Sequence, residues 1–190
     1  MTSFRVLAFA ALLALAGCVR QPEAEADRRM RVVDREREPE RLLARAEALA
    51  QIGDYTRAEQ YLQAARASGA SERAVLPLLI RVCMHDQRYR AAVQHVEEYL
   101  RKHPSQYPVR FVLATLYAGL GEAESARREL ERVVAEAPRH AEAHFALAMV
   151  LRQDLGNYRD ADRHFRAYLE LAPRGPHVAE AQSALMSRVP

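Results

Sequence analysis

The chain has 190 residues, of which 49% are hydrophobic, and a formal net charge of +3. This length suits one domain or one short repeat array, and the apolar share is ample for a core, which argues against global disorder. Glycine is scarce, tryptophan is absent and alanine is abundant, a composition typical of an all-helical protein. Basic residues are interleaved with Glu and Asp, so no basic stripe predicts nucleic acid as a partner.

The first 18 residues have the organisation of a secretory signal peptide. Arg5 supplies a positive charge, residues 6–15 form an apolar stretch too short to span a bilayer, and Ala16 and Gly17 are small residues before a cleavage point. The Leu-Ala-Gly-Cys sequence that ends at Cys18 resembles the lipobox of bacterial lipoproteins. By that resemblance, residues 1–17 are removed and Cys18 carries a covalent lipid. The alternative is an ordinary signal peptide with an incidental cysteine.

A charged segment follows the predicted lipid anchor. Residues 18–38 are predicted to be a tether, and the 20 residues after Cys18 reach about 65 Å when extended. Val19 differs from the Asp that often retains lipoproteins in the inner membrane, so the resemblance implies an outer-membrane protein that faces the periplasm. Cys83 is the only other cysteine, so no intramolecular disulfide is expected.

The rest of the chain repeats itself with a period of 34 residues. Each unit has a turn, then a small residue four or so positions later, and in three units a terminal proline. The small residues are Ala58, Ala92, Ala126 and Ala161, and the prolines are Pro104, Pro138 and Pro173. The fourth unit is displaced by 35, and we expect its extra residue in its first helix, around residues 152–155.

Each unit is predicted to be a helix, a tight turn and a second helix. Apolar residues recur at three- and four-residue spacing in residues 42–50, Gly53 ends that helix, and Asp54 is placed to cap the next one. The recurring alanine lets the paired helices approach each other. Pro77 lies early in the first helix of unit two, which predicts a helix that starts late or bends.

This pattern resembles the tetratricopeptide repeat. The resemblance implies an all-α fold, a right-handed α-solenoid of about four repeats at residues 39–72, 73–106, 107–140 and 141–175. Residues 176–190 fit a C-terminal capping helix, which such arrays need to cover their last apolar face. One departure is the family's early tryptophan, whose place is taken in the four units by Leu42, Leu76, Arg110 and His144.

The resemblance also implies a binding groove, because the first helices of tetratricopeptide repeats line a concave face. Carried over position by position, the groove residues are Leu43, Glu47, Gln51, Arg81, Met84, His85, Phe111, Thr115, Ala118, Phe145, Met149 and Arg152. Phe and Met side chains between Arg81 and Arg152 suit an extended or helical partner segment with acidic groups. The alternative is that Phe111 and Phe145 are core residues of helix packing.

Catalysis finds little support in the sequence. Cys83 is predicted to be a buried structural thiol, because no His and acidic partners recur around it. His140 and His144 have a spacing that allows two helical residues to share a metal, but His140 precedes the helix and the zinc-protease order is absent. We therefore expect no enzyme, no metal and no cofactor besides the lipid on Cys18.

The predicted function is a lipid-anchored scaffold that binds another protein of the bacterial cell envelope. By its combination of lipobox and repeats, the chain is similar to the tetratricopeptide lipoproteins that assist pilus biogenesis and secretin assembly. Two alternatives stay open. One is an assembly factor for exopolysaccharide export or for the outer-membrane β-barrel machinery, and the other is an accessory regulator of a peptidoglycan-acting enzyme.

Overall fold

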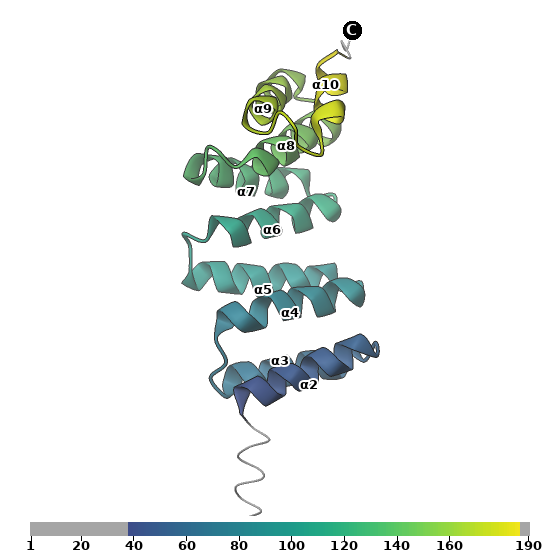
Figure 1. The fold of residues 1–190 in the computed structure, drawn as a ribbon, viewed down its shortest axis with the longest axis vertical. Helices are drawn as coiled ribbons and strands as arrows, with labels where there is room; N and C mark the ends of the chain where they lie inside the picture. Colours follow the sequence, from purple (N-terminus) through teal and green to yellow (C-terminus); the bar gives the residue numbers. More distant parts are fainter. Residues whose placement is uncertain (1–37, 187–190) are drawn as a thin grey trace, which may run out of the picture.

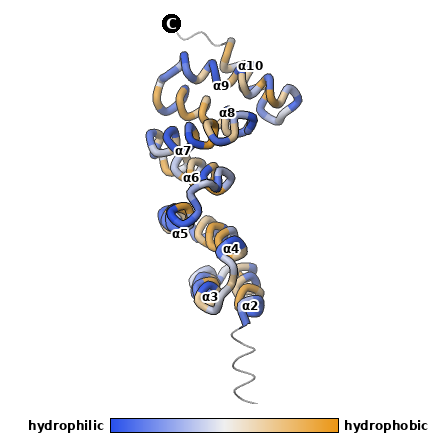
Figure 2. Tube along the Cα trace, turned by 90° about the vertical axis from the view of Figure 1, so that its left-hand side faces the viewer, coloured by the Kyte–Doolittle hydropathy of each residue, from blue (hydrophilic) through white to orange (hydrophobic). Residues whose placement is uncertain are grey.

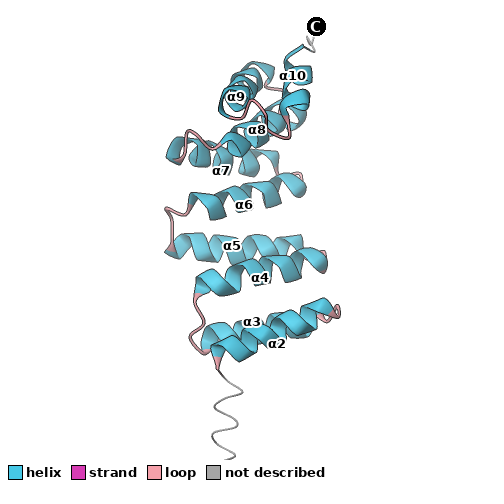
Figure 3. Ribbon diagram, in the orientation of Figure 1, coloured by secondary structure: helices cyan, strands magenta, loops and turns pink. Residues whose placement is uncertain are grey.

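The structure is a computed structural model that describes residues 38–186. The predicted signal peptide, the lipidated Cys18 and the tether lie outside the described residues. The regular structure is α2 (Pro39–Gln51), α3 (Tyr55–Ala67), α4 (Glu72–His85), α5 (Tyr89–Lys102), α6 (Tyr107–Gly119), α7 (Ala123–Glu136), α8 (Ala141–Met149), the π-helix η1 (Val150–Asp154), α9 (Tyr158–Leu171) and α10 (Val178–Met186). Figure 3 shows that helices and loops make up all of the part described.

The helices stack in chain order into an elongated array (Figure 1). Each helix packs mainly on its neighbours in sequence. In the view of Figure 2, α2, α4 and α6 form one layer and α3, α5 and α7 form the other, and apolar and polar residues alternate along the helices. This is the expected all-α solenoid, with amphipathic helices that bury one face each. Within residues 38–186, no helix is long and apolar enough to cross a bilayer.

The small residues of the repeat lie between packed helices. Ala58, Ala92, Ala126 and Ala161 are all completely buried, each in the second helix of its unit. A larger side chain at any of these places would push two helices apart. The prediction that this column of alanines allows close helix packing is therefore confirmed.

The turns inside the repeats share one hydrogen-bonding pattern. In each of the first three units, the residue after the turn donates its N–H to a carbonyl five residues earlier: Asp54 to Leu49, Arg88 to Cys83 and Glu122 to Tyr117, over 2.8–3.0 Å. This helix ending requires a left-handed residue just before the donor. Gly53 and Gly121 supply it at φ 81° and 73°, but unit two has Gln87 there, at φ 57°.

Replacing Gln87 with glycine is expected to raise the free energy of unfolding by about 0.5–1 kcal/mol. The left-handed conformation costs a side-chain-bearing residue roughly 1–2 kcal/mol, and the greater chain freedom of glycine offsets part of the gain. The matched reversal is Gly121→Gln. No atom lies within 4 Å of a Cβ built on Gly121, so its cost would be conformational. Urea unfolding followed by circular dichroism should move the two variants in opposite directions, and a shift of the same sign would contradict this account.

Of the two outcomes predicted for Pro77, a late start or a bend of the helix, the late start is wrong. The helix begins at Glu72, five residues before Pro77, because the Ser71 hydroxyl accepts a hydrogen bond from the Ala74 N–H over 3.3 Å and caps it there. Proline removes the N–H that would reach the carbonyl of Arg73. Arg73 is exposed, so water can serve that carbonyl and the helix passes through Pro77.

The extra residue of the fourth unit is taken up by the π-helix η1. There the Leu155 N–H donates to the carbonyl of Val150, five residues earlier, over 3.2 Å. A π-turn holds one more residue than an α-turn, so it absorbs an insertion without ending the helix. The position of η1 agrees with the range 152–155 predicted for the insertion.

The C-terminal segment turns back over α9 and covers the end of the array (Figure 1). Ala181 of α10 is completely buried against the last core cluster. The connection passes so close to α9 that a Cβ on Gly175 would lie 2.4 Å from the Tyr168 hydroxyl oxygen. That hydroxyl accepts a hydrogen bond from the His177 N–H over 2.9 Å and fixes the connection in place. The capping helix was predicted to start at Pro176, and α10 starts two residues later, at Val178.

Candidate functional site

A hollow of about 450 Å³ lies between the first helices of units three and four. We call it the α6–α8 hollow. Its lining residues are Phe111, Ala114, Thr115, Ala118, Leu130, Glu142, Phe145, Ala146, Met149, Val150, Gln153, Asp154 and His177. Small alanines and large apolar side chains make its floor, and polar groups stand at its edge. Apolar pockets with a few polar groups are typical of sites that bind another molecule.

Phe145 is at once a core residue and a wall of the hollow. Only 8% of its surface is exposed, and its ring packs against Tyr168 with centroids 5.2 Å apart. On the other side it stacks on the His177 imidazole at 4.1 Å and 9°. Phe111 is half-buried and contacts the His140 ring at 5.0 Å. Core packing thus holds both aromatic rings in place, so neither needs to be ordered when a partner binds.

The structure brings part of the predicted groove together and separates the rest. Five predicted residues line the α6–α8 hollow, namely Phe111, Thr115, Ala118, Phe145 and Met149. The others from units one and two lie on α2 and α4, in the N-terminal half of the array: Leu43, Glu47, Gln51, Arg81, Met84 and His85.

The predicted groove residues of the N-terminal half interact mostly with one another and with the core. Arg81 forms an ion pair with Glu47 at 3.7 Å, and both side chains are about half exposed. His85 stacks on Tyr55 at 5.8 Å, and Leu43 packs against the first core cluster. Met84 is 40% exposed. None of these six residues lines the α6–α8 hollow.

Arg152, which was predicted to flank the apolar strip, does not line the hollow. Its side chain is only 15% exposed; the guanidinium lies 5.3 Å from the centre of the Tyr158 ring and 3.9 Å from the Asp162 carboxylate. Arg152 belongs to η1, where the extra residue rotates every later side chain relative to an α-helix. The hollow is lined by Gln153 and Asp154 instead.

Sequence reasoning missed four polar residues of the hollow: Glu142, Gln153, Asp154 and His177. His177 comes from the connection before α10, which follows the last of the four repeats. A signal for Glu142 existed, since it lies three residues before Phe145 and therefore on the same face of the helix. The charged residues that line the hollow, Glu142 and Asp154, are both acidic, and the His177 Nε2 lies 3.4 Å from Glu142.

Units three and four replace the missing tryptophan with a buried polar side chain. Arg110 Nη2 donates to the carbonyl of Pro104 over 2.6 Å, and His144 Nε2 donates to the carbonyl of Pro138 over 3.0 Å. Each thereby ties the start of its unit to the proline six residues earlier. Units one and two have Leu42 and Leu76 at the same place, both buried.

The same two side chains also reach the second helix of their unit. Arg110 Nη1 donates to Glu129 over 2.7 Å, and His144 Nδ1 lies 3.0 Å from His164 Nδ1. His144 donates to Pro138 with Nε2, so in its neutral form Nδ1 accepts and His164 must donate. Burial lowers the pKa of His164, and the nearby His144 ring lowers it further.

We expect the array to lose stability as the pH falls below about 6.5, the ordinary pKa of histidine. The pKa of His164 is lower in the folded chain than in the unfolded chain, so between these two pKa values only the unfolded chain binds the proton. The free energy of unfolding therefore decreases as the pH is lowered through this interval. Melting curves between pH 8 and 5 should show this, and His164→Gln should flatten the profile. His103→Gln, at an exposed histidine, is the control. Equal profiles for wild type and His164→Gln would contradict the prediction.

His140 and His144, whose spacing would allow a shared metal, make other hydrogen bonds. His140 Nδ1 caps α8 by accepting the Ala143 N–H over 3.1 Å, and both ring nitrogens of His144 have partners. By contrast, the prediction that Cys83 has no His and acidic partners is wrong. Glu59 and His95 lie beside its sulfur. Glu59 comes from the preceding repeat, so the spacing within one unit could not show it.

Comparison with known proteins identifies the repeat. Tetratricopeptide repeat profiles match residues 43–107, 84–150 and 141–174. One similar solved structure is a tetratricopeptide repeat protein from Parabacteroides merdae, with 25% sequence identity and a TM-score of 0.68. The match covers 77% of this chain and 58% of the Parabacteroides protein. MamA from Desulfovibrio magneticus RS-1 is 20% identical, with a TM-score of 0.62, over 75% of this chain and 80% of its own.

YrrB has the same fold, with 20% sequence identity and a TM-score of 0.63. The match covers 82% of this chain and 78% of YrrB, which is described as a tetratricopeptide repeat protein with an unusual peptide-binding site. The three profile matches run without a gap from residue 43 to residue 174. They coincide with the stacked helix pairs from α2 to α9. This part of the chain is an array of tetratricopeptide repeats, a scaffold suited to protein–protein interaction.

Proposed function

We propose that the chain is a scaffold that holds an apolar segment of a partner protein in the α6–α8 hollow. The observation that carries this proposal is the meeting of Phe111, Phe145 and Met149 around one open hollow, with Thr115 exposed at its edge. Aromatic and Met side chains at the wall of a hollow are common anchors of protein interfaces. The peptide-binding description of YrrB supports a peptide-like occupant on a similar fold.

The charge of the edge favours a partner with a basic group. Glu142 and Asp154 line the hollow, whereas Arg81 and Arg152, on which an acidic partner would depend, lie elsewhere. A carboxylate selects an opposite charge chiefly by steering association and by excluding like charges. The proposed occupant is therefore an apolar segment that carries Lys or Arg, in place of the acidic segment expected from the sequence.

The envelope setting is also part of the proposal. The lipobox-like end at Cys18 supports a lipid anchor, and Val19 supports the outer membrane, facing the periplasm. Stable anchoring takes more than one acyl chain, which lipoprotein processing supplies. Within the envelope we propose assistance to pilus or secretin assembly. Gene neighbours that encode polysaccharide export, β-barrel assembly or peptidoglycan hydrolysis would favour the corresponding alternative.

Site-specific photo-crosslinking tests the hollow. A photoreactive phenylalanine at Thr115 should capture one partner in cells that encode this chain, and the same residue at Ala135, exposed on α7, should not capture it. Filling the hollow with Thr115→Trp should then abolish co-purification of that partner, while Ala135→Trp retains it. Both variants should keep wild-type circular dichroism. Retention of every partner by folded Thr115→Trp would end the proposal for this hollow.

The anchor is tested separately. Cys18→Ser should leave the chain unprocessed or free of the membrane, because the thiol that would carry the lipid is removed. Labelling with palmitate followed by membrane fractionation measures this. Cys83→Ser is the matched control and should label like the wild type, since Cys83 is buried. Normal labelling of Cys18→Ser would rule the lipid anchor out.

A further inference from the structure

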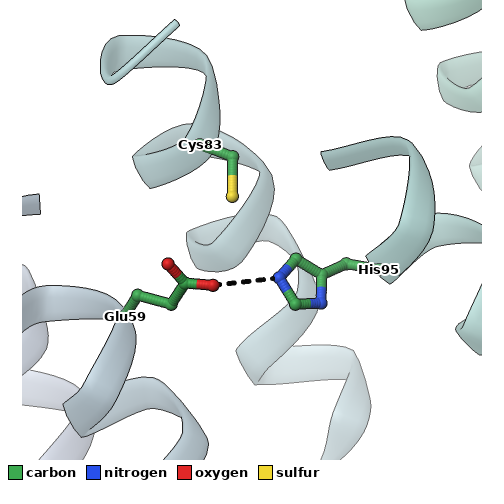
Figure 4. A group of neighbouring side chains, drawn as sticks. All are labelled: Glu59, Cys83 and His95. Carbon is green, nitrogen blue, oxygen red and sulfur yellow. Dashed lines mark hydrogen bonds and ion pairs between the residues drawn. The ribbon is translucent and has the colours of Figure 1, made fainter. Parts of the chain in front are cut away.

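Three side chains that ligate transition metals converge between the first two repeats. Glu59 comes from α3, Cys83 from α4 and His95 from α5, and their ligand atoms all lie within 4.8 Å of one another. Figure 4 shows the three side chains pointing toward a common space, with the Glu59 carboxylate turned to the His95 ring. We propose that Glu59, Cys83 and His95 form a zinc site that joins units one and two.

The distances suit a zinc ion after a small adjustment. For three atoms that all lie within 4.8 Å of one another, there is always a point within about 2.8 Å of each of them. Zinc bonds of about 2.0–2.3 Å therefore require each ligand atom to move by at most about 0.5–0.8 Å. The Glu59 Oε1 and His95 Nε2 are 3.3 Å apart, which is about the edge of a tetrahedron with zinc at its centre. The fourth position is left for water or a partner's ligand.

The surroundings hold the ligands in place. Arg88 Nη1 bonds the other carboxylate oxygen of Glu59 at 2.6 Å, so Oε1 stays turned toward His95. Arg88 is in turn paired with Asp86 at 2.6 Å, so its positive charge is already balanced. Outer partners of this kind orient metal ligands. The Glu59 and His95 side chains are 23% and 15% exposed, which leaves the ion a route in.

Charge balance also favours a divalent ion. One carboxylate, one thiolate and a neutral imidazole cancel the two charges of zinc, and a neutral assembly is the least costly one in a buried setting. On binding, the Cys83 thiol loses its proton to solvent and forms the Zn–S bond. The His95 Nε2, which faces the Glu59 carboxylate, gives up its hydrogen to solvent, Nδ1 takes one from solvent, and the neutral ring binds zinc through Nε2. Carboxylate, imidazole and thiolate together suit zinc better than magnesium or calcium.

A catalytic role for the same three residues does not fit their geometry. In a cysteine–histidine–acid triad, the two ring nitrogens of histidine serve the two partners separately. Here Glu59 bonds the Nε2 that a nucleophilic thiol would need. Cys83 is completely buried, and burial raises its pKa to about 11, so the free thiol is a poor nucleophile.

Cobalt binding tests the site through the thiolate. The full chain is used with Cys18→Ser in every arm, so that Cys83 is the one thiol present. Titration with Co²⁺ should give one equivalent bound, with a sulfur-to-cobalt charge-transfer band that zinc abolishes. Cys83→Ser should lose that band, and Glu59→Gln and His95→Gln should weaken binding at least about 10-fold. His103→Gln is the matched control, because it removes a histidine that contacts Glu72 without a thiol nearby.

X-ray absorption of the zinc-loaded Cys18→Ser chain gives a second answer that does not depend on the folding of the ligand variants. The expected shell has one sulfur at about 2.3 Å and nitrogen or oxygen atoms at about 2.0–2.1 Å. A shell without sulfur, a missing charge-transfer band, or equal weakening by His103→Gln would each overturn the site. These outcomes are independent of whether the α6–α8 hollow binds a partner.

Discussion

Replacing Arg110 with leucine is expected to lower the free energy of unfolding by about 3 kcal/mol, although units one and two carry leucine at this place. In unit three, Glu129 is only 14% exposed and receives a hydrogen bond from Arg110. Breaking a buried ion pair from one side costs about 3–5 kcal/mol, because the partner is left buried and charged. The lower end applies because Arg132 remains 3.2 Å from Glu129.

The double variant Arg110→Leu/Glu129→Tyr should recover most of that loss. It places leucine and tyrosine where unit one has Leu42 and Tyr61, which line one pocket together, and a well-packed apolar pair can replace a buried ion pair at little cost. Glu129→Tyr alone should be destabilising, since it leaves the Arg110 guanidinium with only the 3.7 Å contact to Glu136 among its carboxylate partners. Urea unfolding of the wild type and the three variants forms a double-mutant cycle. Additive losses would show that the two residues do not act as a pair.

The repeat itself could be predicted because it depends on local rules. The period, the left-handed turn and the buried alanines each need particular residues at fixed spacing, and these stand in the sequence. The same rules placed the insertion of unit four correctly. The resemblance to the tetratricopeptide repeat also indicated a shared face for Phe111, Thr115, Ala118, Phe145 and Met149, and these five line one hollow.

The features that escaped prediction depend on contacts outside one repeat. The side-chain direction of Arg152 could not be predicted. A π-turn rotates the side chains around it, and the sequence does not show at which residue the π-turn lies. His177 reaches the hollow from the connection that follows the last repeat. Glu59 meets Cys83 across a repeat boundary, and a pattern read unit by unit does not contain that pair.

The wall of the hollow depends on a residue that no partner would touch. Tyr168 is the largest completely buried side chain in the described part of the chain. Its ring packs against Phe145, and its hydroxyl holds the backbone of His177, whose ring stacks on the same Phe145. Tyr168 therefore links α9, the hollow and the C-terminal connection.

Tyr168→Ala is accordingly expected to cost about 3–5 kcal/mol, the range for removing a buried aromatic side chain. The His177 N–H also loses its acceptor, so α10 should exchange its amide hydrogens faster than α2 does. The matched control is Tyr99→Ala, the same change at the corresponding place two repeats earlier, where the side chain is half-buried and the loss should be less than half as large. Thermal melting and hydrogen exchange measure the two effects. If both variants melt alike and α10 keeps its protection, the cap is held by its own apolar contacts with α9, and the hollow owes its shape to Phe145 rather than to Tyr168.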